Sequence, residues 1–165
     1  MRTILLAAGF GKRLMPLTKD IPKCLVPING VPLLEIWLTR LIKFNLGPFL
    51  INTHYMSGQV ESYINGSQHS KKVTIANEPV LMGTAGTLVK NLNFFQGKDG
   101  LLIHSDNYCM ANFNAFIDAH QNRPKECLLT MMTFRTNNPS ACGIIKLNQK
   151  GIVTQFYEKV TNPPG

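Results

Sequence analysis

The sequence predicts an α/β domain with a Rossmann-like central sheet, mixed but mostly parallel, and with helices on its flanks. Apolar strand-like runs alternate with segments of helical periodicity along most of the chain. Repeated strand–helix–strand order is typical of parallel sheets, because parallel neighbours need a crossover between them. Two late strand-like runs are instead joined by the short turn 148–151, which predicts an antiparallel portion.

Seven apolar runs are expected to form strands. They are residues 3–8, 49–53, 73–76, 101–104, 127–134, 143–147 and 153–157. The first run is short and continuously apolar, which is typical of a buried strand rather than of the longer apolar region of a signal peptide. The segment from Gly9 to Gly30 follows it as a long loop rich in Gly, Pro and basic residues.

Four segments are expected to form helices. They are residues 33–44, 58–64, 84–91 and 112–121. The first of them has clear helical periodicity and ends at Asn45-Leu46-Gly47-Pro48, a strong stop signal. Thr84 is a candidate N-cap for the third helix, because its hydroxyl can accept a hydrogen bond from a free backbone amide.

Length and composition indicate one soluble globular domain. The chain has 165 residues, of which 44% are hydrophobic and 16% are charged, and these values argue against disorder. No apolar run approaches the ~20 residues of a membrane span. Four cysteines lie far apart without a CxxC motif, so reduced thiols are expected and zinc is not. We therefore expect a cytoplasmic protein without a membrane partner.

The net charge of +8 raises the hypothesis of a nucleic-acid-binding domain. The distribution of the basic residues weakens it, because they are scattered and form no run longer than two. A few basic residues that converge near the N-terminus suit a small polyphosphate equally well. We therefore expect no nucleic-acid partner.

The loop after the first strand carries the strongest chemical signal. Gly9 and Gly11 allow backbone amides to approach phosphate oxygens, and the planar guanidinium of Arg13 can bind phosphate through two donors. Leu14 stands where a dinucleotide-binding loop needs its third glycine, and no Gly-Lys-Ser/Thr of a Walker loop occurs. An ordinary surface turn is the alternative when the glycines are considered alone.

Lys23, the loop 78–84 and Asp106 are further candidates for the same site. Lys23 lies between two prolines that restrain its backbone, although a solvated loop lysine is the alternative reading of that segment alone. Ligands of α/β folds bind beyond the C-terminal ends of the strands. The loop after Ala8, the loop 78–84 and Asp106 would all lie at that edge of the sheet.

Five blocks of the sequence, in matching order and at compatible spacing, resemble the sugar-1-phosphate nucleotidyltransferase family, in particular mannose-1-phosphate and heptose-1-phosphate guanylyltransferases. The blocks span nearly the whole chain. They are Leu6-Ala7-Ala8-Gly9-x-Gly11-x-Arg13-Leu14-x-Pro16-Leu17-Thr18, Pro22-Lys23-x-Leu25 with Pro32-Leu33, Glu78-Pro79-x-x-Met82-Gly83-Thr84-Ala85-Gly86-Thr87-Leu88, His104-Ser105-Asp106, and Cys142-Gly143-Ile144 with Phe156-Tyr157-Glu158-Lys159.

The resemblance implies transfer of a nucleotidyl group from an NTP to a sugar 1-phosphate, with Mg²⁺ as cofactor and pyrophosphate as second product. It assigns catalysis to Arg13 and Lys23 and the metal to Asp106. Nucleotide binding falls to Ala7, Ala8, Gly9, Gly11, Arg13, Glu78, Gly83 and Thr84. Sugar-phosphate binding falls to Asp106, Gly143, Glu158 and Lys159. We expect His54 and His104 to be packed or hydrogen-bonded, because this chemistry needs no histidine base.

The resemblance also indicates a partner nucleotide. A carboxylate at Glu78 could accept hydrogen bonds from the two donors of guanine, whereas uracil and thymine offer one, and this favours GTP. Members of the family continue beyond the Glu-Lys block with a second metal-binding aspartate. We therefore expect a single catalytic domain over 1–165 that lacks its C-terminal part, and leave open whether it forms homo-oligomers. The alternative function is a non-catalytic nucleotide or nucleotide-sugar sensor, or a regulatory subunit of the same fold.

Overall fold

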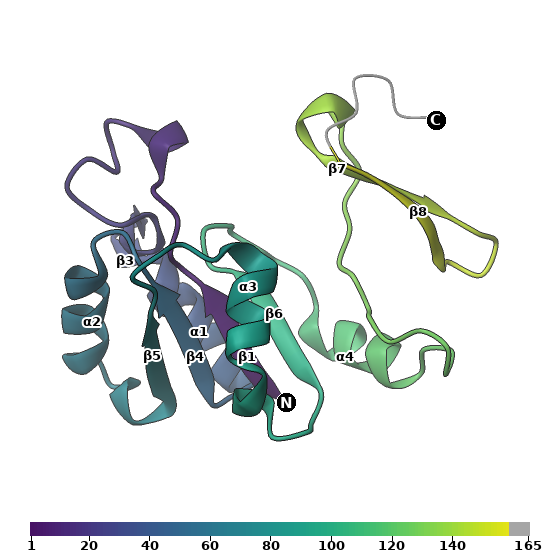
Figure 1. Cartoon of the computed structure of the whole chain (residues 1–165), viewed down its shortest axis with the longest axis horizontal. Helices are drawn as coiled ribbons and strands as arrows, with labels where there is room; N and C mark the ends of the chain where they lie inside the picture. Colours follow the sequence, from purple (N-terminus) through teal and green to yellow (C-terminus); the bar gives the residue numbers. More distant parts are fainter. Residues whose placement is uncertain (159–165) are drawn as a thin grey trace. The chain divides into compact units, whose positions relative to one another are not determined.

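The computed structural model describes residues 1–158 and begins with a four-stranded parallel sheet (Figure 1). Its strands are β1 (Arg2–Leu6), β4 (Phe49–Thr53), β5 (Val73–Asn77) and β6 (Gly100–His104). They lie in the order β5-β4-β1-β6, and every pairing between neighbours is parallel. The predicted α/β fold with a parallel central sheet is thereby confirmed.

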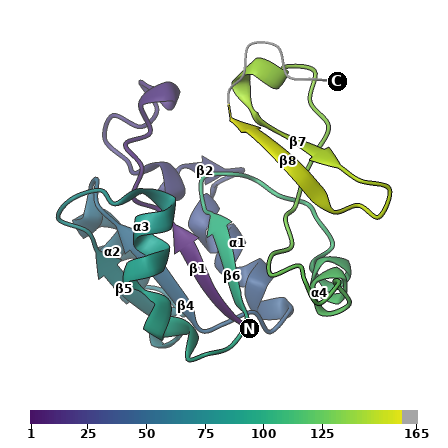
Figure 2. The same ribbon diagram turned by 45° about the vertical axis from the view of Figure 1, so that its right-hand side comes forward.

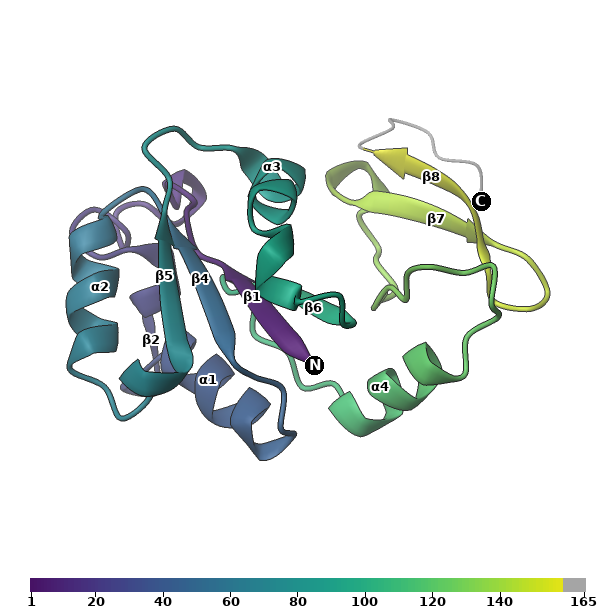
Figure 3. The same cartoon turned by 60° about the horizontal axis from the view of Figure 1, so that its bottom comes forward.

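Three helices connect these strands: α1 (Leu33–Lys43), α2 (Ser57–Asn65) and α3 (Gly83–Lys90). The chain passes from β1 through α1 to β4 and through α2 to β5, and then returns through α3 to β6 on the other side of β1. This reversal places α1 and α3 on opposite faces of the sheet (Figures 2 and 3). It also creates a switch point beyond the C-terminal ends of β1 and β6. No helix within residues 1–158 is long and apolar enough to cross a membrane.

Both faces of the sheet are packed, which explains why its strands are nearly continuous apolar runs. On the α3 face, Ile4, Leu50 and Phe95 form a buried cluster against which Leu88 of α3 packs. Because side chains alternate along a strand, Leu5 and Ile51 point to the α1 face. The α1 face is also buried from solvent. Its fully buried residues include Leu5, Leu34, Leu38, Leu41 and Ile51.

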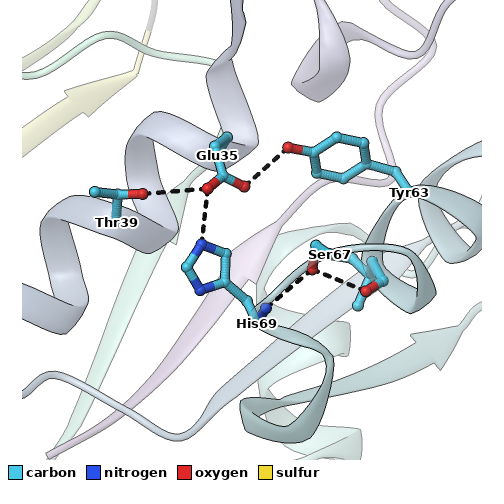
Figure 4. Close-up of polar contacts among 6 residues, drawn as sticks. Glu35, Thr39, Tyr63, Ser67 and His69 are labelled. Atoms are coloured by element: carbon cyan, nitrogen blue, oxygen red, sulfur yellow. Dashed lines mark hydrogen bonds and ion pairs between the residues drawn. The ribbon is translucent and has the colours of Figure 1, made fainter.

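A polar network joins α1, α2 and the short 3-10 helix η3 (Ser70–Lys72). The carboxylate of Glu35 on α1 accepts a hydrogen bond from the Tyr63 hydroxyl at 2.8 Å and pairs with Nε2 of the buried His69 at 2.8 Å (Figure 4). Burial alone would raise the pKa of Glu35, but its hydrogen bonds to His69 and Tyr63 outweigh burial and lower it. The two helices on this face are therefore joined by a charged group as well as by apolar contacts.

The loop expected between Gly9 and Gly30 contains more structure than predicted. Two 3-10 turns, η1 (Lys12–Leu14) and η2 (Lys23–Leu25), are followed by a small hairpin of β2 (Pro27–Ile28) and β3 (Val31–Pro32). Asn29 and Gly30 form its turn with φ values of 49° and 79°. Asn-Gly is the pair that favours two positive φ angles in succession, so the sequence did carry the signal.

The contacts of the chain divide it into two compact units, and the second begins at Ala111. It contains α4 (Phe113–Gln121), capped by the side chain of Asn112, and the antiparallel hairpin of β7 (Gly143–Leu147) and β8 (Val153–Glu158). Asn148 closes the hairpin turn by accepting hydrogen bonds from the Lys150 and Ile152 amides. The hairpin was predicted correctly, whereas the single catalytic domain over 1–165 stays a prediction.

The strand predicted over 127–134 is wrong. This segment has no regular structure, and no strand within residues 1–158 pairs with it. Leu128, Leu129 and Phe134 are 87%, 72% and 79% exposed. Apolar β-prone residues form a strand only where a neighbour satisfies their backbone groups, and none is available to this segment in the described part of the chain.

The Glu35 network predicts a pH-dependent contribution to stability. Because the pKa of Glu35 in the folded protein is below its ordinary value of 4.5, its ionised form stabilises the fold above that pH and loses its effect as the pH falls through the folded value. We expect Glu35→Gln to lower the free energy of unfolding at pH 7 by about 1 kcal/mol. The difference from the wild type should persist down to about pH 4.5 and then shrink in urea titrations taken to lower pH, as the pH falls through the folded pKa of Glu35.

Glu61→Gln is the matched control, because it removes the same charge from α2, where no contact of the Glu61 carboxylate is found among residues 1–158. Its effect should stay within about 0.5 kcal/mol at every pH. A loss of stability in Glu35→Gln that does not shrink at any pH below 4.5 would show that the charge of Glu35 contributes nothing.

Candidate functional site

A cavity of about 150 Å³ lies at the switch point of the sheet. We call it the switch-point cavity. Five segments of the sequence form its walls, all of them within the first unit. Its lining residues are Leu6, Ala7, Ala8, Gly9, Lys23, Cys24, Asn52, Leu81, Gly83, Thr84, His104, Ser105 and Asp106. The sheet edge predicted to bind a ligand is therefore hollowed.

Lys23 and Asp106 meet at this cavity. The Lys23 Nζ atom lies 2.6 Å from Oδ2 of Asp106, and the two side chains are 21% and 35% exposed. Asp106 is held in place through Ser105, whose amide and hydroxyl both donate to the Leu6 carbonyl, at 3.1 and 2.6 Å. The two residues are separated by 83 positions in the sequence, and the pairing of β6 beside β1 brings them together.

The loop from Gly9 to Thr18 leaves the cavity at Gly9. Gly11 has a φ of 67°, and an added Cβ there would lie 3.1 Å from Thr18. The buried Thr18 closes the loop by donating its hydroxyl to the Gly11 carbonyl at 2.8 Å. Arg13 is exposed on this loop and is not part of the cavity wall. The loop therefore presents a glycine backbone to the cavity and a guanidinium to solvent.

The helix α3 begins at Gly83, one residue earlier than expected. Its N-cap is Met82, whose side chain makes no capping hydrogen bond, so the prediction that Thr84 caps the helix is wrong. The Glu78 carboxylate accepts a hydrogen bond from the Met82 amide at 3.2 Å and takes over the capping role. Gly83 and Thr84 are left free to line the cavity.

Glu78 does not contact the cavity as expected of a residue that reads a base. The residue is 1% exposed and is not part of the cavity wall. Besides the Met82 amide, its carboxylate accepts hydrogen bonds from Asn52 Nδ2 at 3.0 Å and from the Thr87 hydroxyl. Burial would raise the pKa of Glu78, but these hydrogen bonds outweigh it and lower the pKa. In this geometry the carboxylate is ionised and already occupied by protein donors.

Asn52 and Thr87 are functional candidates that the sequence analysis missed. Asn52 lines the cavity, and its Oδ1 accepts a hydrogen bond from the Ala7 amide at 2.8 Å. Its Nδ2 donates to Thr87 Oγ1 at 3.1 Å as well as to Glu78. Asn52 was detectable as a polar residue inside an apolar run, because β4 is buried at all five of its positions. Thr87, inside a helix, offered no comparable signal.

The side chains of His54 and His104 have different environments. Nδ1 of His54 lies 2.7 Å from the Glu78 carbonyl, as expected of a hydrogen-bonded residue. The prediction that His104 is packed or hydrogen-bonded is not met, because its side chain is exposed and lines the cavity. His104 is the last residue of β6, and the alternation of side chains along the strand directs it away from the core.

Of the predicted sugar-phosphate residues, Asp106 lines the cavity in the first unit, whereas the other three lie in the second unit or outside the described residues. Gly143 and Glu158 are paired across the ends of β7 and β8. A Cβ on Gly143 would approach the Phe156 ring to 2.7 Å, so a larger residue here would require that exposed ring to move. Lys159 lies outside the described residues. The structure therefore brings Gly143 and Glu158 together and leaves their predicted role a prediction.

The donor set of the cavity fits Mg²⁺ through one protein ligand. Asp106 offers a partly exposed carboxylate, the type of oxygen that Mg²⁺ prefers. Within residues 1–158, no cluster of three or more His, Cys, Asp or Glu side chains could hold a metal. Mg²⁺ commonly binds through one or two carboxylates and completes its shell with substrate phosphates and water. Asp106 alone is compatible with that arrangement.

Comparison with known proteins gives one family. The family model described as nucleotidyl transferase matches residues 2–165. Mannose-1-phosphate guanylyltransferase of Mycobacterium tuberculosis is 25% identical over 162 residues, which cover 98% of this chain and 45% of that protein. Glucose-1-phosphate adenylyltransferase of Cutibacterium acnes is 29% identical over 178 residues, which cover 99% of this chain and 44% of that protein. The chain thus spans less than half the length of these relatives.

A solved structure shares the fold. HddC from Yersinia pseudotuberculosis, determined in complex with GMP-PN, matches with a TM-score of 0.74 and 20% identity. The match covers 96% of this chain and 69% of that chain. This likeness agrees with the parallel sheet and flanking helices described above.

The cavity geometry makes a prediction about Cys24 that needs no ligand. Cys24 is 1% exposed, and burial, together with the nearby charge of Asp106, raises the pKa of its thiol to about 12. Because the thiolate is the reactive form, we expect Cys24 to resist alkylation by iodoacetamide at pH 8 in the folded protein. Cys109, Cys127 and Cys142 are half-buried and should be modified faster.

Peptide mass spectrometry after timed alkylation measures all four thiols in one experiment. Unfolding the protein in urea is the control, since all four cysteines should then react at similar rates. Modification of Cys24 in the folded protein as fast as the other three would contradict the burial of the segment that positions Lys23.

Proposed function

Because the chain belongs to the nucleotidyl transferase family, we propose that it transfers a nucleotidyl group from a nucleoside triphosphate to a sugar 1-phosphate. The products would be a nucleotide-sugar and pyrophosphate. The observation that carries the proposal is the convergence of Lys23 and Asp106 at the switch-point cavity, beside the glycine loop after β1. A cationic donor, a hard oxygen ligand and a glycine backbone at one edge are what such a reaction needs.

The reaction joins two anions, and this determines what the protein must supply. An oxygen of the sugar phosphate attacks the α-phosphorus, the new P–O bond forms, and the bond to pyrophosphate breaks with its electron pair leaving on pyrophosphate. Catalysis of such a transfer is mostly positioning and charge neutralisation. Lys23 would donate to oxygens of the α-phosphate, and Arg13 with the Gly9 and Gly11 backbone would hold the triphosphate.

The Lys23–Asp106 pair indicates how the charges are shared. The pair is neutral as a unit, so Lys23 must exchange its carboxylate partner for phosphate oxygens to act on substrate. Mg²⁺ bound at Asp106 would supply positive charge to both the carboxylate and the phosphate oxygens. Asp106 would then no longer compete for the Lys23 ammonium, whose three donors can turn to the α-phosphate.

The two walls of the cavity suggest the orientation of the nucleotide. The ionised Glu78 carboxylate lies at the N-terminus of α3 and offsets the partial positive charge of that helix end. That wall is therefore a poor place for a triphosphate and a suitable one for base and ribose, next to Ala7, Ala8, Gly83 and Thr84. The opposite wall, with Gly9 and Lys23, carries the phosphates.

GTP is the nucleotide we propose first, with mannose 1-phosphate or a related sugar phosphate as acceptor. The support is the Mycobacterium tuberculosis relative, which is named a mannose-1-phosphate guanylyltransferase. The expected guanine contact of Glu78 no longer supports this choice, because that carboxylate is buried. The adenylyltransferase among the relatives makes ATP the second nucleotide to test. Gly143, Glu158 and Lys159 remain proposed for the sugar phosphate by resemblance.

A non-catalytic nucleotide or nucleotide-sugar sensor is the second candidate function. The observation that favours it is that Asp106 is the only carboxylate among the residues that line the cavity in the described part of the chain. A site with one metal-binding carboxylate can bind a nucleotide and still fail to complete the transfer. The two functions differ in one measurable product, which is pyrophosphate.

Pyrophosphate release tests the proposal. The intact chain, with its mass verified, is supplied with Mg²⁺, each of the four NTPs and a panel of sugar 1-phosphates. We expect release with one pair of substrates, and expect Lys23→Ala to lower kcat/KM by about 100-fold or more, since an aimed charge on the reacting phosphate is lost. Asp106→Asn should have a comparable effect and raise the Mg²⁺ concentration needed for half-maximal rate.

Lys19→Ala is the control, because Lys19 is an exposed lysine nearby on the chain that does not line the cavity. Its kcat/KM should stay within about threefold of wild type. Nucleotide binding without pyrophosphate release from any pair would sink the catalytic proposal and support the sensor. Release that is unchanged in Lys23→Ala would remove the observation on which the proposal rests.

A further inference from the structure

One buried polar cluster lies behind the lining of the switch-point cavity. It consists of Glu78, Asn52 and Thr87, which are 1%, 3% and 0% exposed, and we call it the Glu78 network. Glu78 follows β5, Asn52 belongs to β4, and Thr87 belongs to α3. The network therefore joins β4 to the segment that runs from the end of β5 into α3, two parts of the chain that are separated by α2.

Every member of the network is fixed by the others. One oxygen of Glu78 accepts hydrogen bonds from Asn52 and Thr87. The Thr87 hydroxyl donates its hydrogen bond to Glu78, so its oxygen is free to accept a hydrogen bond from the second N–H of Asn52, at 3.1 Å. The amide orientation of Asn52 follows, with Nδ2 toward the network and Oδ1 toward β1.

The network reaches the cavity at two points. Oδ1 of Asn52 accepts a hydrogen bond from the Ala7 amide at 2.8 Å, where β1 ends and the glycine loop begins. The second oxygen of Glu78 accepts a hydrogen bond from the Met82 amide at 3.2 Å, directly before Gly83 and Thr84. Ala7 and Thr84 both line the proposed nucleotide site, so the network holds the two chain segments that carry them in fixed relative positions.

We propose that Glu78, Asn52 and Thr87 are positioning residues that fix the width of the nucleotide pocket and do not themselves read the base. The inference rests on the proposed function, since it assigns a role to residues behind that pocket. Base selectivity then comes from the groups that line the cavity. Disturbing the network weakens the binding of every nucleotide by a similar factor.

The geometry separates this role from base reading. A residue that reads a base presents polar atoms to it, and losing such a residue penalises one nucleotide more than the others. The Glu78 carboxylate presents almost no surface and already accepts three hydrogen bonds from the protein. A network that holds backbone segments acts on the common shape of the pocket instead.

Thr87→Val is the sharpest test, because valine keeps the shape of threonine and removes the hydroxyl that both donates to Glu78 and accepts from Asn52. Thr3→Val is the matched control. Thr3 is also fully buried, and its hydroxyl donates to the Leu46 carbonyl at 3.1 Å, near the start of β1 and away from the cavity. Thr87→Ser restores the hydroxyl and serves as the conservative rescue.

The experiment measures dissociation constants for GTP, ATP, UTP and CTP by calorimetry with Mg²⁺, together with the melting temperature of each variant. Both valine variants should melt a few degrees lower than wild type, since each loses a buried hydrogen bond. Only Thr87→Val should weaken the nucleotides that the wild type binds, by about tenfold each and with their order preserved. Thr87→Ser should bind within about threefold of wild type.

Two results would overturn the inference and leave the proposed function intact. The first is wild-type affinity in Thr87→Val in spite of its lower melting temperature. The second is a loss confined to one nucleotide, which would make the network a base reader. Failure of the wild type to bind any nucleotide is a different result, because it overturns the proposed function and this inference with it.

Discussion

A buried carboxylate must be satisfied by donors, and in this protein that requirement is met by Glu78. An ionised group without hydrogen bonds in a dry interior would cost several kcal/mol at the least. Donors from β4, from α3 and from the backbone before α3 remove that cost. Because those donors belong to separate elements, satisfying one charge also fixes the relative positions of the segments that surround the cavity.

The topology of the sheet supplies the rest of the site. The chain reverses its direction across the sheet after β5, which places β6 beside β1 and opens a cavity beyond their ends. Lys23 arrives there from the long loop after β1, and Asp106 arrives from the end of β6. Neither residue is close to the other in the sequence, and their pairing at 2.6 Å depends on parallel register between two strands.

The sequence predicted the parallel core and much of the site, because apolar runs and glycine loops are local signals. Lys23, Asp106, Gly9 and the Gly83–Thr84 pair all reach the cavity as expected. The burial of Glu78 could not be predicted, because the sequence does not distinguish an exposed loop carboxylate from a buried one whose hydrogen-bond donors come from other elements. The segment 127–134 shows the opposite limit, since its β-prone composition says nothing of whether a neighbouring strand is present to pair with it.

That segment has a practical consequence for the protein in solution. Residues 127–134 contain no charged residue, no proline and no glycine, and Leu128, Leu129 and Phe134 are mostly exposed. An exposed apolar stretch of this kind outside any sheet is a template for intermolecular β-sheet, the starting point of aggregation. These eight residues, which lie outside the cavity, therefore favour self-association of the chain, and the high positive charge opposes it by mutual repulsion.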